Sequence, residues 1–351
     1  MEYALNKFKN KIEFVRNQLY SQKLANDLRI LIKSKGLSKE ENDILDSILS
    51  NRTDEKVYQY TANIISLYGA LESFVETIVD EYLKALSLLF PSYDALKNTT
   101  GIDDYMIFAT SLLSHAEGHK FKNLAKKDVL KGMYEVLIND KSSVLHSEAF
   151  IDVGGGNYKH EIIMKCFRNM GVRDISSKLK KFEPLHGYIQ EKGIDTSSSI
   201  YAKVDDLVER RNELAHGADS PELIDSDRFF ELLSFFPIYA ETINNYLDNE
   251  LKRYEWESLE RGAIEQRVYR DNIIELNGEL VEVGTTFAKG QKLYILRDEK
   301  YYDGEIENIQ VDKVDYEVYT KVASETVIGL KIRSICDITK TCKIKFRAIE
   351  Q

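Results

Sequence analysis

The feature that most constrains the fold is a change in hydrophobic periodicity near residue 262. Before that point apolar residues recur at spacings of three and four, and only four prolines interrupt the 351-residue chain, a pattern typical of amphipathic helices. After it, short segments alternate apolar and polar residues, as half-buried strands do. The sequence therefore predicts a multidomain, mainly α protein, with a helical bundle followed by a small antiparallel β-barrel.

The periodicity also predicts where the elements and domains lie. We expect helices over residues 5–33, 38–49, 55–90, 103–115, 127–138, 158–170, 198–216 and 226–257. A chain of 351 residues is long enough for more than one domain. We expect N-terminal helices over 1–54 that pack on the bundle, a helical domain over 55–260, and the barrel over 262–351.

The C-terminal part carries strand and turn signals. The stretch "NIIELNGELVEVG" consists of two alternating segments joined by Asn277-Gly278, a dipeptide that favours a tight β-hairpin turn. Further strands are expected in the segments "QKLYIL", "GEIENIQV", "YEVYTKV", "VIGLKI" and "KIKFRAI".

Composition excludes several classes of protein. No apolar run approaches the ~18 residues that a membrane-spanning helix requires, and the N-terminus lacks the features of a signal peptide, so we expect a cytoplasmic protein without a membrane partner. The formal net charge of −10 argues against broad nonspecific nucleic-acid binding, although it permits a local basic patch. Neither the three cysteines nor the histidines show metal-ligand spacing, and we expect no metal and no cofactor.

The stretch "VERRNELAHG", residues 208–217, places an arginine where a core residue is expected. At ~100° per residue, an apolar arc holds Arg211 in its middle, although a buried guanidinium is costly without partners. Asn212 and His216 lie at the edge of this arc, one turn apart, and Gly217 is expected to end the helix. The arc itself consists of Ile200, Val204, Leu207, Val208, Leu214 and Ala215.

These residues allow two interpretations. An imidazole near a helix C-terminus, a guanidinium and a carboxamide on one edge can bind and cleave a phosphodiester. The alternative is that Arg211 and His216 form an ordinary C-capping and surface feature. Spacing alone leaves both open.

Other segments carry weaker signals. Glu72 lies on a mostly apolar stripe and is expected either to pair with Arg211 across the bundle or to face solvent. Lysines are concentrated in two segments. We expect their side chains either to bind an RNA backbone or to form an ordinary solvated surface. The glycines of "DVGGGNYKH" lack the ending of a P-loop and are expected to form a turn before an Asn157 N-cap. The lysines include Lys120, Lys122, Lys126 and Lys127, with further ones at Lys131, Lys178, Lys180 and Lys181.

The motif "ERRNELAHG" resembles the Arg-x4-to-6-His signature of the HEPN superfamily (higher eukaryotes and prokaryotes nucleotide-binding), in which a polar residue commonly follows the arginine. The segments "SLYGALESFVETIVDEYL" and "GGGNYKHEIIMKCFRNMGV" resemble helices of HEPN nucleases linked to bacterial defence. Together the similarities span residues 55 to 255, and the motif is their specific part.

This resemblance implies a metal-independent endoribonuclease that forms a homodimer around one RNA groove. Arg211, Asn212 and His216 would be its catalytic residues, supported by Glu72 and Arg210, and the products would carry 2′,3′-cyclic phosphate and 5′-hydroxyl ends. The setting would be antiviral defence or toxin-type growth arrest, with a protein trigger or inhibitor as a possible partner. Ala218 stands where antitoxin-controlled members often carry a modified tyrosine, which argues against that route of control. The alternative is a HEPN-like module that binds RNA or protein without cleaving.

The C-terminal segment "VEVGTTFAKGQKLYIL", with the strands after it, is similar to the β-barrel second domain of translational GTPases. This resemblance implies a recognition module for tRNA, a ribosomal component or a phage protein. A dimer-supporting or sensing appendage is the alternative reading.

Overall fold

The computed structural model describes residues 1–33, 36, 38–49, 52–118, 120–151, 157–194, 200–216, 223–259, 267–268, 272–276 and 281–349. The chain divides into two compact units, Met1–Tyr246 and Leu247–Gln351. The finer division of the chain into three regions remains a prediction.

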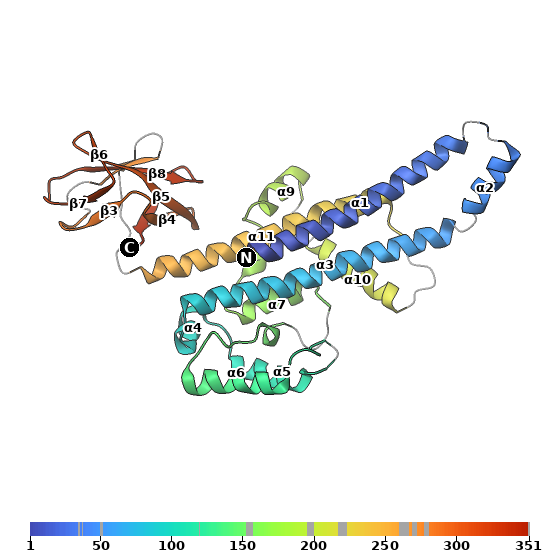
Figure 1. The fold of residues 1–351 in the computed structure, drawn as a ribbon, viewed down its shortest axis with the longest axis horizontal. Helices are drawn as coiled ribbons and strands as arrows, with labels where there is room; N and C mark the ends of the chain where they lie inside the picture. Colours follow the sequence, from blue (N-terminus) through green and yellow to red (C-terminus); the bar gives the residue numbers. More distant parts are fainter. Residues whose placement is uncertain are drawn as a thin grey trace. The chain divides into compact units, whose positions relative to one another are not determined.

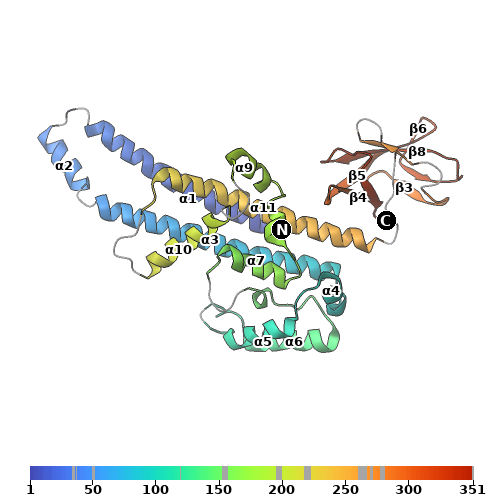
Figure 2. The same ribbon diagram turned by 180° about the vertical axis from the view of Figure 1, so that it is seen from behind.

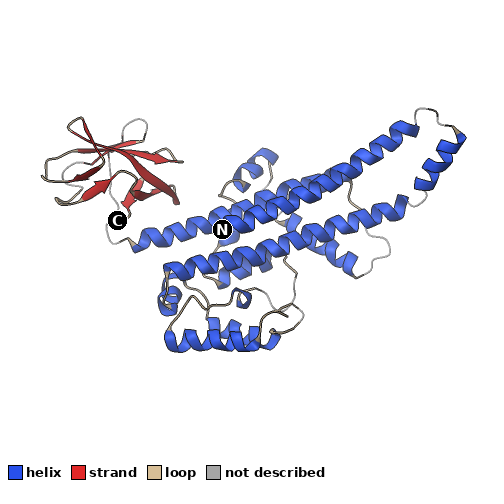
Figure 3. Ribbon diagram, in the orientation of Figure 1, coloured by secondary structure: helices blue, strands red, loops and turns tan. Residues whose placement is uncertain are grey.

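The first unit is helical throughout (Figures 1 and 3). Its helices are α1 (Glu2–Lys33), α2 (Lys39–Leu49), α3 (Arg52–Leu89), α4 (Tyr93–Thr100), α5 (Tyr105–His115), α6 (Lys126–Asn139), α7 (His160–Asn169), α8 (Ile175–Leu179), α9 (Leu185–Lys192), α10 (Ala202–Ala215) and the first part of α11 (Ser226–Ser258), with a 3₁₀ turn at Ser147–Ala149. From Leu247 onward α11 belongs to the second unit. The mainly helical fold expected from periodicity is confirmed.

Three long helices form the frame of this unit. α1 lies along both α3 and α11 in the two opposite views (Figures 1 and 2). Lys9 pairs with Glu241 at 2.7 Å, and Arg16 donates to the Leu233 carbonyl oxygen at 3.0 Å. α3 is the central element, because its side chains at three- and four-residue spacing are almost completely buried: Ile64, Leu67, Leu71, Val75, Ile78, Val79 and Tyr82.

Three short helices, α4, α8 and α9, were not among those predicted from sequence. They have five to eight residues, too few to show a helical period. These helices form because they contact residues that are distant in the chain. Ser92, for example, caps α4 by accepting from the Ala95 N–H and also hydrogen-bonds Asp140, 48 residues away.

The start of α7 also corrects an expectation. Its N-cap is Lys159, which provides no side-chain cap, and the Asn157 N-cap predicted from sequence is wrong. The His160 N–H instead donates to the Asp205 carboxylate of α10 at 2.8 Å. Lys159 also forms an ion pair with Glu209 at 2.8 Å. These two contacts bind α7 to α10. The glycines before Asn157 lie outside the described residues.

A buried histidine completes this junction. The His160 ring stacks on Tyr201, with centroids 3.6 Å apart, and its two nitrogens lie 2.9 Å from the Tyr239 hydroxyl and 2.7 Å from the Ser176 hydroxyl. Burial, aided by the charges of Lys180 and Arg168, lowers the pKa of His160 to about 3. The imidazole is therefore neutral in the folded protein at neutral pH.

This depressed pKa predicts acid destabilisation of the helical unit. Below the ordinary histidine pKa of about 6.5 the unfolded chain takes up a proton at residue 160, whereas the folded chain does not until about pH 3. The contribution of the neutral His160 to the free energy of unfolding is therefore fully present above about pH 6.5 and is lost as the pH falls. Between pH 7 and 5, the wild type should lose about 2 kcal/mol more unfolding free energy than His160→Gln.

Urea unfolding followed by circular dichroism at 222 nm measures this, because most of the helical signal comes from the first unit. Trp256, the single tryptophan of the chain, lies at the end of α11 in the second unit, so its fluorescence does not report on the surroundings of His160. Equal pH dependence in the two proteins would show that His160 is not the responsible group.

The second unit is a curled antiparallel sheet, a half-barrel, and confirms the β domain expected after the helices. Its strands are β1 (Arg267–Val268), β2 (Ile273–Leu276), β3 (Thr286–Ala288), β4 (Lys292–Arg297), β5 (Lys300–Val311), β6 (Val314–Tyr316), β7 (Val318–Thr320), β8 (Ile328–Ser334) and β9 (Lys343–Phe346). The main sheet runs β1-β2-β8-β5-β4-β9, β6 pairs with β5, and β3 and β7 form a two-stranded ribbon. Alternating residues such as Ile328, Leu330 and Ile332 face its core.

The predicted hairpin around Asn277-Gly278 is corrected in part. That dipeptide lies outside the described residues, but Val281–Gly284 forms no strand. β2 pairs with β1 on one side and β8 on the other, so the long-range partner β8 occupies the edge where a hairpin strand would lie. The last turns of α11 pack on this sheet, where Lys252 pairs with Asp303 at 2.7 Å and Arg347 with Glu255 at 2.8 Å.

Candidate functional site

Helix α10 carries the Arg211–His216 motif and packs on α3. Val204, Leu207 and Val208 are fully buried, as the predicted arc requires. Leu214 is half-buried and Ala215 is exposed, so the arc is wrong for the last turn, which is less covered by its neighbours. The motif therefore lies where α10 passes from the core to the surface.

Arg211 occupies the edge of this core. It is half-buried, and its guanidinium lies 4.7 Å from the centroid of the Tyr68 ring of α3. Its Nη1 donates to Asn212 Oδ1 at 3.0 Å. Within the described ranges, no carboxylate forms an ion pair with Arg211. The ring face and the amide thus offset the desolvation of the guanidinium and leave its positive charge available to an anion.

His216 follows one turn after Asn212. It is the C-cap residue of α10, and its backbone N–H donates to the Asn212 carbonyl oxygen at 3.0 Å. Its side chain is exposed and makes no hydrogen bond with any residue that the structure describes. The helix ends as predicted, although Gly217 and Ala218 lie outside the described residues. An exposed imidazole here can reach a ligand held by Arg211 and Asn212.

Arg210, the neighbouring arginine, has different contacts. Its Nε donates to Asp206 at 2.9 Å and its Nη1 to the Tyr60 hydroxyl at 3.2 Å, and only 12% of its side chain is exposed. Arg210 therefore anchors α10 on α3, whereas Arg211 keeps a free charge.

Glu72 lies one turn from Tyr68 and is half-buried. Burial, with the nearby charge of Glu76, raises the pKa of Glu72, while Lys120 and Arg211 oppose the shift. The carboxylate is thus within the electrostatic field of Arg211. The ion pair between Glu72 and Arg211 expected from sequence is not formed in the described part of the chain.

A network of contacts that begins at the Tyr68 ring connects Arg211 to one of the expected RNA-binding lysines. Lys120 donates to the Tyr158 hydroxyl at 3.2 Å and lies 3.6 Å from Glu76, to which that hydroxyl donates at 3.1 Å. The Tyr158 backbone N–H donates to the Tyr68 hydroxyl at 3.5 Å. Lys120 therefore belongs to the surroundings of Arg211.

The other expected lysines are separate from this network. Lys122, Lys126 and Lys127 are exposed on the turn before α6 and its first residues, and no contact joins them to Arg211 or Tyr68 within the described ranges. Sequence reasoning missed Tyr158 and Glu76 as site residues and placed Tyr68 only on a packing stripe, because no local pattern marks residues that meet across about 80 to 140 positions of chain.

The described residues contain neither a metal-binding cluster nor a membrane-spanning helix. No group of three or more histidine, cysteine, aspartate or glutamate side chains there has the arrangement of a metal site. None of the described helices combines the length and hydrophobicity needed to cross a bilayer.

Comparison with known families identifies the helical domain. The family model described as RiboL-PSP-HEPN matches residues 23–249, which include Tyr68, Tyr158 and all of α10. The chain belongs to the RiboL-PSP-HEPN family. The match confirms membership of the HEPN superfamily and supports a role in RNA cleavage or RNA binding. No curated protein and no solved structure matches the chain.

Proposed function

We propose that this HEPN protein is a metal-independent endoribonuclease, acting in antiviral defence or toxin-type growth arrest. The observation that carries the proposal is the state of Arg211: half-buried, held over Tyr68 and by Asn212, and without a carboxylate partner in the described residues. A guanidinium fixed in this way binds a phosphate without first breaking an ion pair. His216 lies at the end of the same helix and provides the general acid or base.

The reaction uses the RNA as its own nucleophile. His216 takes the proton of the ribose 2′-hydroxyl, or gives one to the leaving 5′-oxygen, as the 2′-oxygen attacks phosphorus and the P–O5′ bond breaks. Arg211 stabilises the negative charge that develops on the phosphorane, and Asn212 orients the phosphate or His216. The products are a 2′,3′-cyclic phosphate and a 5′-hydroxyl.

Incubation with total RNA and a tRNA pool in EDTA tests this function. We expect the wild type to cleave, and sequencing that captures cyclic phosphates should map 2′,3′-cyclic ends. Cleavage that requires a divalent cation, or that leaves 3′-hydroxyl ends, would contradict the mechanism.

A second candidate function is binding of RNA without cleavage. The exposed His216 side chain favours it, because catalytic histidines usually have one ring nitrogen oriented by a hydrogen bond. RNA binding by the wild type, without product in any condition and without toxicity on expression, would support this reading.

The site is proposed to be completed by a second copy of the chain. One face of α3 carries Tyr58, Ala62, Ile65 and Gly69, spaced by four, three and four residues. Tyr58 is 75% exposed and Ile65 51%, and a Cβ on Gly69 would meet no atom within 4 Å. Ile65 lies one turn before Tyr68 on α3, so this face is continuous with the site. Packing of two such faces would bring two Arg211–His216 motifs together.

This arrangement predicts that Ile65→Lys yields a monomer, because it places a charge in the centre of the proposed interface. Analytical ultracentrifugation should show loss of the dimer, and the rate of RNA cleavage should fall in proportion to the fraction of dimer that remains. Ile107→Lys on α5 is the matched control, since Ile107 is 70% exposed and lies on a different helix from Tyr68. Full activity of a monomeric Ile65→Lys protein would exclude a shared site.

Tyr68 is proposed as a positioning residue for Arg211. Tyr68→Leu removes the ring face and should lower kcat about tenfold with little change in KM, since a cation–π contact contributes about 0.5–2 kcal/mol. Tyr68→Phe keeps the ring and should restore kcat. It should still lower the melting temperature, because the Tyr158 N–H loses its acceptor. Equal kcat in the leucine and phenylalanine variants would argue against this role.

A further inference from the structure

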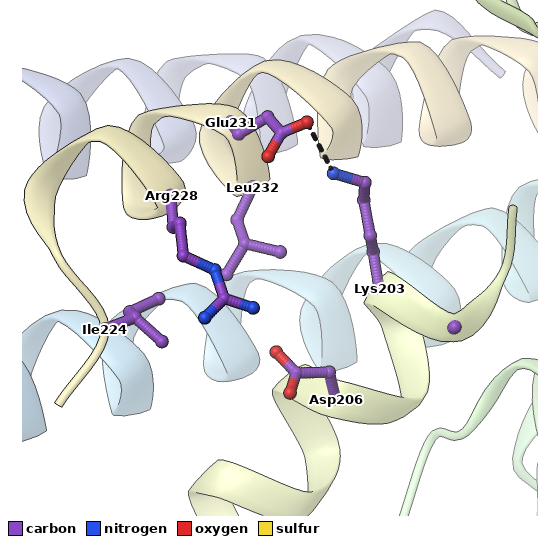
Figure 4. Close-up of a pocket in the computed structure, with 7 residues that line it drawn as sticks. Lys203, Asp206, Ile224, Arg228, Glu231 and Leu232 are labelled. Carbon is purple, nitrogen blue, oxygen red and sulfur yellow. Dashed lines mark ion pairs between the residues drawn. The ribbon is translucent and has the colours of Figure 1, made fainter. Parts of the chain in front are cut away.

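A pocket of about 200 Å³ opens on α10, on a different side from Arg211. It lies between the first half of α10 and the start of α11 (Figure 4). Lys203 and Asp206 contribute one wall from α10. The other walls come from the α11 side of the pocket and consist of Ile224, Arg228, Glu231 and Leu232.

The walls combine three kinds of chemistry. Lys203 and Glu231 form an ion pair across the pocket at 3.1 Å. The exposed Arg228 points its guanidinium inward, toward the Asp206 carboxylate (Figure 4), and has no ion-pair partner in the described part of the chain. Leu232, which is 6% exposed, and Ile224 provide apolar surface. A ligand that fits has an anionic group, a flat apolar ring system and hydrogen-bond donors.

The pocket is also linked to the proposed catalytic residues. Asp206 holds Arg210 at 2.9 Å, and Arg210 directly precedes Arg211. Five residues of helix separate Asp206 from Arg211, a rise of about 7.5 Å. This is about two steps of a stacked nucleic-acid strand, at about 3.4 Å per nucleotide. Asp206 also lies about 140° around the helix from Arg211, so an RNA strand that curves around α10 from Arg211 can reach the pocket.

We propose that this pocket binds a nucleoside monophosphate unit of the RNA close to the cleavage site and so determines sequence preference, an inference that rests on the proposed ribonuclease function. Arg228 binds the phosphate, and Ile224 and Leu232 pack against the base. The carboxylates of Asp206 and Glu231 accept hydrogen bonds from the base. Guanine is the favoured base, because its N1–H and N2 amino group offer two parallel donors to one carboxylate.

The first arm of the test measures binding of free nucleotides. GMP, AMP, CMP and UMP are titrated separately into the wild type, Arg228→Gln and Arg173→Gln, with calorimetry as readout. Arg173 is the matched control, since it is an exposed arginine outside the pocket. We expect GMP to bind most tightly to the wild type and the control, and about tenfold more weakly to Arg228→Gln. Failure of the wild type to bind GMP at millimolar concentration overturns the proposal.

The second arm distinguishes an RNA nucleotide from a free one. Cleavage sites are mapped on one RNA pool for the same three proteins, and we expect the preference for guanine near the cut to weaken only in Arg228→Gln. GMP binding that depends on Arg228, with an unchanged cleavage pattern, would overturn the RNA subsite and assign the pocket to a free nucleotide. Arg228-dependent GMP binding by a wild type that cleaves no RNA would refute the proposed ribonuclease function and leave a nucleotide pocket.

Discussion

Substitution of His216 by alanine is expected to lower the rate of RNA cleavage by about 10²–10⁴-fold, the usual contribution of general acid–base catalysis. The side chain is exposed at the end of α10, so its removal leaves the fold intact and the melting temperature unchanged. Binding of RNA should weaken much less than cleavage, because the proposed phosphate ligands Arg211 and Asn212 are unchanged.

The measurement is single-turnover cleavage of one RNA that the wild type cuts. His115→Ala is the matched control, because His115 is also an exposed histidine in the last turn of a helix, α5. Its cleavage rate should equal that of the wild type. An unchanged rate in His216→Ala would remove this residue from the mechanism.

Replacement of Arg211 by lysine is expected to cost about 10²–10³-fold in cleavage rate, similar to the loss of one donor that stabilises an oxyanion. Lysine keeps a positive charge near Tyr68 but lacks the planar fork that donates at once to Asn212 and to a phosphate. KM should rise modestly while kcat falls steeply, because charge develops on the phosphate in the transition state.

Arg210→Lys provides the comparison on the same helix. The Arg210 guanidinium is occupied by Asp206 and Tyr60 and is not available to a ligand. This change should therefore lower the melting temperature and leave the cleavage rate within a few-fold of wild type. A protein in which Arg211→Lys retains full function would be a binding module, since a binding site can accept a point charge where catalysis cannot.

The long elements of the fold could be predicted from sequence. The bounds of α3 and α11 lie within a few residues of those expected, because a 3.6-residue period repeated over more than thirty residues is an unambiguous signal. The core strands β5 and β8 likewise follow from alternation. Short helices such as α9, and the pairing of β2 with β8, could not be predicted, because they depend on partners distant in the chain.

For the candidate site, too, only the features within a single helix could be predicted from sequence. The sequence by itself determined that Arg211 lies on the packing side of a helix, with Asn212 beside it and His216 at the helix end, because rotation along a helix is a property of spacing alone. Only the tertiary structure decided that Tyr68 lies under Arg211, that Tyr60 holds Arg210, and that Glu72 stays unpaired with Arg211. These contacts join α3 to α10 across roughly 140 residues. They depend on how two helices pack, which no periodicity within either helix specifies.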